Sequence, residues 1–162
     1  MKKAALWAVL ILSMYVFQTS LLPMLSYNGI SANLMLLLTM SVAFIKGNRY
    51  GVFIGFITGL LQDLTTGSFF GCDIFSYMLI GLLCGKFSNQ IFKDQFFLPV
   101  ITSSFVTLIH YAIIVSFIFM LGYKLNLQWN LQHTLLPMIC YQLMLAYPVY
   151  KLTFEFNEKL KK

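Results

Sequence analysis

Residues 51–71 read GVFIGFITGLLQDLTTGSFFG, and they carry the clearest pattern in the chain. Glycine occurs at 51, 55 and 59, aspartate at 63, and glycine again at 67 and 71, so every step is four residues. Four residues of α-helix turn through about 400°, which places Gly51, Gly55, Gly59 and Asp63 on one slowly drifting face. Small residues at this spacing let two membrane helices approach closely, and a carboxylate at that depth needs a partner. We therefore predict a packing groove with one polar contact.

The composition of the whole chain indicates a membrane protein. Of its 162 residues, 59% are hydrophobic and only 10% are charged, whereas a soluble domain carries about a quarter charged residues. Residues 4–45 contain no charged side chain, and neither do residues 95–123. A spanning helix needs about 20 apolar residues, so residues 4–45 suffice for two spans separated by a turn at Pro23–Ser31.

We predict an all-α, polytopic membrane protein that forms a single integral membrane domain over residues 1–162. The six transmembrane helices are expected at about 4–25, 31–46, 50–66, 73–88, 97–121 and 130–150, followed by a cytoplasmic tail at 151–162. With both termini in the cytoplasm, ten basic residues lie inside and only Lys124 lies outside, as the positive-inside rule favours. The ten are Lys2, Lys3, Lys46, Arg49, Lys86, Lys93, Lys151, Lys159, Lys161 and Lys162.

The last span and the tail leave two points open. Pro137 and Pro148 predict a kink or an end of the helix, unless neighbouring groups satisfy the freed carbonyls. Leu152, Phe156 and Leu160 are four residues apart in the tail. This spacing fits an amphipathic helix on the inner leaflet, or a continuation of the sixth span.

Three polar residues beside apolar runs are assigned structural roles. Asp63 is expected to make a helix-end or interhelical hydrogen bond, although it could instead bind an ion, a substrate or a partner. Asp73 is expected to be the N-cap of the fourth helix, and Asn33 to cap the second helix or to bond another helix. Gly67 and Gly71 are assigned to the turn that follows the third helix.

A second pair of small residues, Gly81 and Gly85, lies on the fourth predicted span. The simplest hypothesis packs the third and fourth helices as antiparallel neighbours through the face of Gly51, Gly55 and Gly59 and through this pair. The alternative leaves one glycine face open to dock a helix of another protein. The sequence does not distinguish between the two.

No pattern typical of an enzyme is present in the sequence. There is no Ser-His-Asp order, nucleotide-binding glycine loop or H-E-x-x-H motif. His110 lies in mid-span with no carboxylate or second histidine near it on its own helix, so we expect a structural histidine rather than a proton relay. We therefore expect no catalytic residues, metal or cofactor. The net charge of +6 lies at membrane edges, which favours anionic lipids of the inner leaflet as partners over nucleic acid.

Residues 55–85, GFITGLLQDLTTGSFFGCDIFSYMLIGLLCG, resemble the signature of the rod shape-determining protein MreD family. Gly55, Gly59, Asp63, Gly67 and Gly71 match the family pattern position by position. The family often has Pro-Asp before the second helix, whereas this chain has Ala32-Asn33, so an ionic role at that position is in doubt.

The resemblance implies a multi-pass protein of the bacterial inner membrane. It implies a non-enzymatic scaffold of the cell-wall elongation complex (elongasome) that helps to determine rod cell shape. The implied partners are the single-span protein MreC, the cytoskeletal protein MreB and the peptidoglycan synthases.

A second function class stays open. MreD-like folds resemble the six-helix substrate-binding subunits of energy-coupling-factor vitamin transporters. Such subunits often carry an Ala-x-x-x-Ala contact on the first helix, and Ala4 and Ala8 have that spacing. The predicted outer loops are short and offer few hydrogen-bonding side chains for a vitamin pocket, which favours the scaffold.

Overall fold

The computed structural model describes residues 2–26, 32–66, 70–88, 97–122 and 131–161. Every regular element in these ranges is helical, so the predicted all-α class is confirmed for this part of the chain. The elements are α1 (Lys2–Ser20), the short 3-10 turn η1 (Leu22–Leu25), α2 (Leu34–Lys46), α3 (Asn48–Thr66), α4 (Cys72–Phe87), α5 (Phe97–Met120), the π-helical turn η2 (Leu131–Leu135) and α7 (Leu136–Lys161).

The core of the molecule is built around α2. Every residue from Leu34 to Phe44 is buried, including the polar Thr39 and Ser41. The hydroxyl groups of these two residues donate to carbonyl oxygens one turn earlier in α2, at Met35 and Leu37. Contacts come to α2 from α1, α3, α4, α5 and α7, so the leucine-rich run is covered on all sides.

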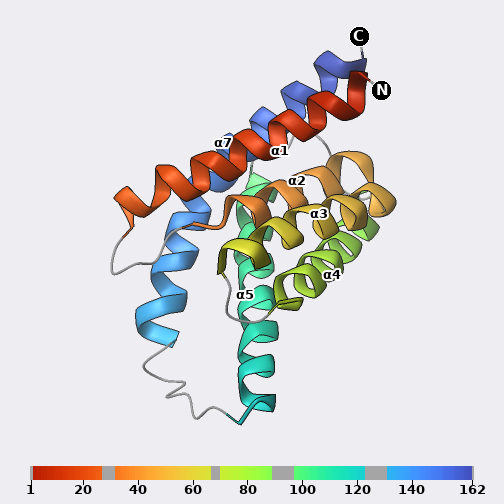
Figure 1. Cartoon of the computed structure of the whole chain (residues 1–162). Coiled ribbons are helices and arrows are strands. Elements are labelled where there is room, and N and C mark those ends of the chain that lie inside the picture. Colours follow the sequence, from red (N-terminus) through yellow and green to blue (C-terminus); the bar gives the residue numbers. More distant parts are fainter. Residues whose placement is uncertain (1, 27–31, 67–69, 89–96, 123–130, 162) are drawn as a thin grey trace.

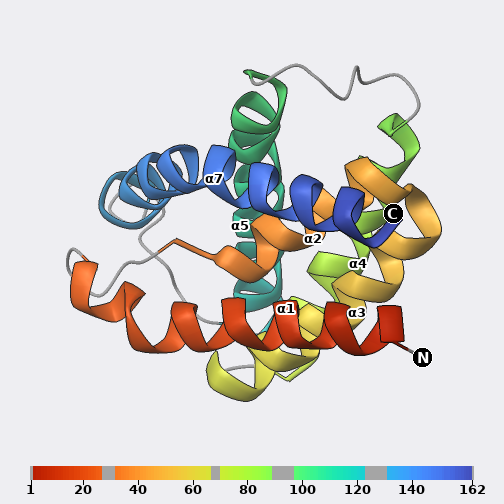
Figure 2. The same cartoon turned by 90° about the horizontal axis from the view of Figure 1, so that it is seen from above.

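The two ends of the described chain lie at the same end of the molecule (Figures 1 and 2). In both views α1 and the C-terminal part of α7 run past the core toward the same end of the molecule. The rings of Trp7 and Phe156 meet edge to face there, with centroids 5.4 Å apart. The ammonium of Lys46 lies 4.1 Å from the centroid of the Trp7 ring and 5.2 Å from that of Tyr50, which ties the end of α2 to the same cluster.

The last helix is longer than the sequence suggested. It continues from Leu136 through Pro148 to Lys161, so Pro148 does not end it, and the predicted tail is a continuation of this helix. Its first part runs beside α5 (Figure 1), and its later part meets α1 where the rings of Trp7 and Phe156 are in contact. Phe156 and Leu160 are half-buried against the core. These two apolar residues of the tail therefore pack within the chain, whereas Leu152 is 48% exposed.

Two stretches of the described chain are long and apolar enough to cross a membrane, namely Leu6–Met24 and Pro99–Met120. The apolar helix α2 has 13 residues and is therefore about 20 Å long, shorter than the roughly 30 Å hydrocarbon core of a bilayer. The six-span topology and the likeness to vitamin-transporter subunits stay predictions.

The third and fourth helices form a hairpin in which the backbones are in contact. A Cβ atom added at Gly55 would lie 2.5 Å from the Tyr77 carbonyl oxygen, and one at Gly59 would lie 2.6 Å from the Ile74 Cα. A Cβ atom at Gly51 would meet the Gly81 carbonyl oxygen at 2.6 Å. Real Cβ atoms do not approach backbone this closely, so α3 and α4 can pack in this way only because these positions have no side chain.

The two glycines of α4 complete the same contact. A Cβ at Gly81 would collide with the Gly51 backbone, and one at Gly85 with the backbone of Asn48. The face of Gly51, Gly55 and Gly59 is thus occupied by α4, and at Gly51 also by Ala43 of α2. Docking of another protein on these glycines would require α3 and α4 to separate.

We expect Gly55→Leu and Gly59→Leu each to destabilise the protein by about 3 kcal/mol, because the new side chain meets backbone that cannot move aside without parting the two helices. Thermal unfolding of the purified protein in mild detergent measures this effect.

Phe53→Leu is the matched control, since Phe53 lies on the same helix and its side chain is 62% exposed. We expect its melting temperature to stay close to that of the unsubstituted protein. If both glycine variants had the same melting temperature as Phe53→Leu, the result would contradict the backbone contact between α3 and α4.

Candidate functional site

The carboxylate of Asp63 caps the N-terminus of α4 from the neighbouring helix α3. It lies in the last turn of α3 and is 4% exposed. One of its oxygens, Oδ2, accepts hydrogen bonds from the backbone N–H groups of Gly71 (2.9 Å) and Ile74 (3.1 Å), and Oδ1 accepts one from Asp73 (3.1 Å). The first N–H groups of a helix have no partner within the helix, and their partial positive charge favours an anion. Asp63 therefore satisfies these donors from a neighbouring helix.

The prediction that Asp73 is the N-cap of α4 is wrong. The N-cap is Gly71, which has φ +105° and no capping side chain, and Asp73 lies within the first turn. The position of Asp73 beside α4 favoured it as the cap, whereas the residue that accepts the N–H hydrogen bonds is Asp63, at the end of α3. Gly71 stands at the turn between these helices, as predicted, and Gly67 lies outside the described residues.

The N-terminus of α2 is capped in a similar way by three side chains. Asn33 is the N-cap residue, and its Oδ1 accepts from the backbone N–H of Leu36 at 3.1 Å. Gln18 of α1 accepts from the N–H of Met35 at 3.0 Å. Gln142 of α7 accepts from the N–H of Asn33 at 3.1 Å and donates to its carbonyl oxygen at 3.3 Å.

The same side chains connect the remaining helices. Nδ2 of Asn33 donates to the hydroxyl oxygen of Tyr77 on α4, and Tyr77 is fully buried. Nε2 of Gln18 donates to Oε1 of Gln62 on α3 at 2.7 Å. One hydrogen-bond network, made by Gln18, Asn33, Gln62, Tyr77 and Gln142, therefore joins α1, α2, α3, α4 and α7. Asn33 makes both the N-cap bond and the interhelical bond, which the sequence left as alternatives.

His110 extends this network to α5. Its Nδ1 lies 2.7 Å from the Ser76 hydroxyl, its Nε2 lies 3.8 Å from Oδ1 of Asp73, and its ring centroid lies 5.4 Å from that of Tyr77. On its own helix His110 has no acidic neighbour, but the fold brings Asp73 to it from α4. That contact could not be found from spacing within one helix.

Serine, histidine and aspartate, the residue types of a hydrolytic triad, meet at this point. Ser76 is 0% exposed and His110 is 3% exposed, and a nucleophile must reach its substrate. In this conformation the cluster offers no surface to a substrate. Its geometry instead fixes the position of α5 against α4 through hydrogen bonds in an apolar environment.

Gln18, Gln62 and Gln142 are residues of this hydrogen-bond network that the sequence analysis did not single out. Each is an uncharged amide within a predicted membrane span, and Gln62 stands directly before Asp63. Polar amides of this kind form hydrogen bonds between membrane helices, so their position in the sequence was a usable signal.

We expect Asp63→Asn to cost about 1–2 kcal/mol, because the amide keeps one acceptor oxygen while its NH2 group faces a backbone N–H donor. Asp63→Leu should cost about 3 kcal/mol or more, because it leaves every donor at the start of α4 without its carboxylate partner. Unfolding curves in detergent measure both.

Thr65→Ala is the control for these variants, since the Thr65 hydroxyl donates to carbonyl oxygens of its own helix, at Leu61 and Gln62. If Asp63→Asn and Asp63→Leu unfold normally but both abolish function completely, the charge has a role beyond capping.

We expect Asn33→Asp to be tolerated within about 1 kcal/mol, because a carboxylate still caps α2 and the Tyr77 hydroxyl can donate to it. Asn33→Ala should cost about 2 kcal/mol, because both the cap and the bond to Tyr77 are lost. Thermal stability distinguishes the two variants. Ser41→Ala is the buried control in the same helix, and equal losses in both Asn33 variants would contradict the dual role.

Comparison with known proteins identifies the family of the chain. A protein-family model described as rod shape-determining protein MreD matches residues 1–157. No curated protein and no solved structure matched. The family match extends well beyond the glycine and aspartate motif, over nearly the full length of the sequence. The chain therefore belongs to the rod shape-determining protein MreD family.

Proposed function

We propose that this protein is a non-enzymatic scaffold of the bacterial cell-wall elongation complex. In this role it lies in the inner membrane as a six-span protein with both termini in the cytoplasm. It binds an MreC-like single-span protein, and through the complex it works with MreB and the peptidoglycan synthases. Anionic lipids surround its cytoplasmic edge.

The observation that carries the proposal is the family match over residues 1–157, since the family is defined by rod shape determination. The packing of the chain supports a scaffold. Its polar groups bond one another across five helices, and its glycine face is occupied internally. The described helices therefore form an assembly that is held together by its own hydrogen bonds and close backbone contacts.

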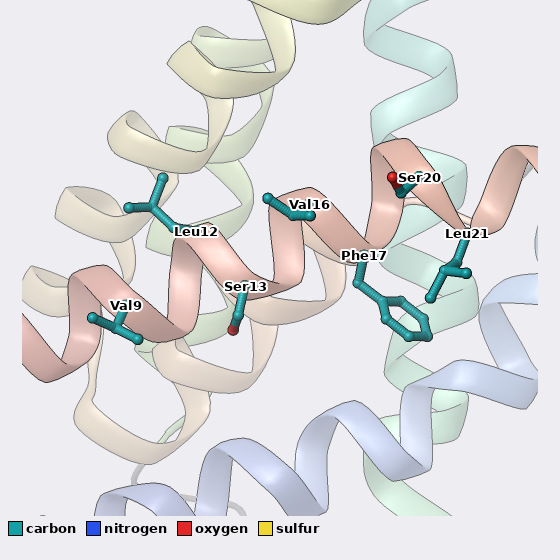
Figure 3. A pocket seen from close by; sticks show the side chains of 7 residues that line it. All are labelled: Val9, Leu12, Ser13, Val16, Phe17, Ser20 and Leu21. Carbon is teal, nitrogen blue, oxygen red and sulfur yellow. The ribbon is translucent and has the colours of Figure 1, made fainter.

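Two apolar helices present surfaces on which a partner helix could pack. Only 28% of the spanning window of α1 is buried within the chain, and only 22% of that of α5. A shallow hollow of about 480 Å³ lies along the exposed side of α1, and Figure 3 shows the side chains of α1 and of Leu21, just after it, that line the hollow. The lining residues are Val9, Leu12, Ser13, Val16, Phe17, Ser20 and Leu21.

Purification of the tagged full chain in mild detergent, followed by mass spectrometry, should recover an MreC-like single-span protein. A scaffold of the elongation complex must hold this partner, whereas a vitamin-binding subunit would bring a coupling ATPase and its membrane subunit. Recovery of the transporter components in place of the single-span protein would refute the proposal.

Two matched variants make the same capture more informative. Ser20→Phe places a large ring in the hollow on α1, and Ser116→Phe places one on the exposed side of α5, where Ser116 is exposed. Loss of the partner with only one of them identifies the helix that it contacts. Stability should be unchanged in both, because each serine faces outward.

A further inference from the structure

The hairpin of α3 and α4 carries two exposed cations at one end. Arg49 lies in the first turn of α3 and Lys86 in the last turn of α4, and both side chains are exposed. Gly85 packs against the Asn48 backbone at this end. In an antiparallel helix pair, the residue that follows each contact position turns to the same side of the pair. Arg49 and Lys86 therefore emerge side by side on one face of the hairpin.

The charge at this end is uncompensated in the described part of the chain. Neither Arg49 nor Lys86 takes part in an ion pair there. The acidic residues of these helices, Asp63 and Asp73, are buried at the opposite end of the hairpin. Lys46, at the nearby end of α2, directs its ammonium to the rings of Trp7 and Tyr50.

An apolar surface continues from the two cations along the same face. On α3, Phe53 and Phe56 follow Arg49 at the spacing of one helix face and are 62% and 44% exposed. On α4, Leu83 and Phe75 precede Lys86 at similar spacing and are 38% and 51% exposed. The face thus has two positive charges at one end and a long apolar stretch beyond them, which matches an anionic headgroup with its acyl chains.

We propose that this face binds an anionic phospholipid, with the phosphate between Arg49 and Lys86 and the acyl chains along Phe53, Phe56 and Leu83. The inference rests on the proposed orientation, which places this end of the hairpin at the inner leaflet. It does not depend on the protein partner of the scaffold, so failure to capture that partner leaves the lipid site intact, and failure of the lipid site leaves the scaffold role intact.

Native mass spectrometry of the delipidated full chain in detergent tests the site, with dioleoyl-phosphatidylglycerol and dioleoyl-phosphatidylcholine as probes. The unsubstituted protein should retain phosphatidylglycerol in preference to phosphatidylcholine. Arg49→Gln with Lys86→Gln should lower the affinity for phosphatidylglycerol by about tenfold or more, since each basic residue near an anionic membrane contributes about a fivefold effect. Binding of phosphatidylcholine should not change.

Two further variants control for net charge and for folding. Lys151→Gln with Lys159→Gln removes the same charge from exposed positions of α7 and should weaken phosphatidylglycerol binding much less than the Arg49 and Lys86 glutamine variant does. Arg49→Lys with Lys86→Arg keeps both charges and should retain most of the affinity. Unchanged binding in the Arg49 and Lys86 glutamine variant, or an equal loss in the α7 control, would overturn the proposed site.

Discussion

The fold depends on satisfying the backbone N–H groups at helix starts that lie inside the protein. A helix start leaves several donors without an intrahelical partner, and an apolar environment supplies no water to bond them. At α2 the acceptors come from Gln18, Asn33 and Gln142, and at α4 from Asp63. These side chains come from α1, α3, α7 and the residue just before α2, so the caps also fix how the helices are arranged. The hydrogen bonds that cap the first turns of α2 and α4 are therefore the same bonds that hold neighbouring helices together.

The glycines and the aspartate of the central motif act together in this arrangement. Gly59 brings α3 against the backbone of Asp73 and Ile74, and one turn later Asp63 accepts hydrogen bonds from the N–H groups of these same residues. A side chain at position 59 would push α4 away and lengthen the bonds to the carboxylate. The spacing of four therefore places three close contacts and one cap in line along a single helix face.

The sequence predicted the helical class, the approximate positions of the helices and the small-residue faces, because these follow from hydropathy and local spacing. It did not predict that Asp63 would replace Asp73 as the acceptor at α4, or that Asp73 would approach His110. Both depend on which helices become neighbours, and spacing within one helix carries no information about that. The amides of Gln18, Gln62 and Gln142 were visible in the sequence, but their partners lie up to 109 residues away.

The meeting of Trp7 and Phe156 has a consequence for how the chain assembles during synthesis. The first helix leaves the ribosome long before the residue that holds its beginning in place, because that residue lies near the end of α7. Until then α1 is held mainly through its contacts with α2 and η1, and its remaining surface faces the surroundings. The nascent protein thus spends most of its synthesis with Trp7 held by Lys46 of α2 and not yet by Phe156, and chains that stop short of Phe156 lack the second ring of this contact.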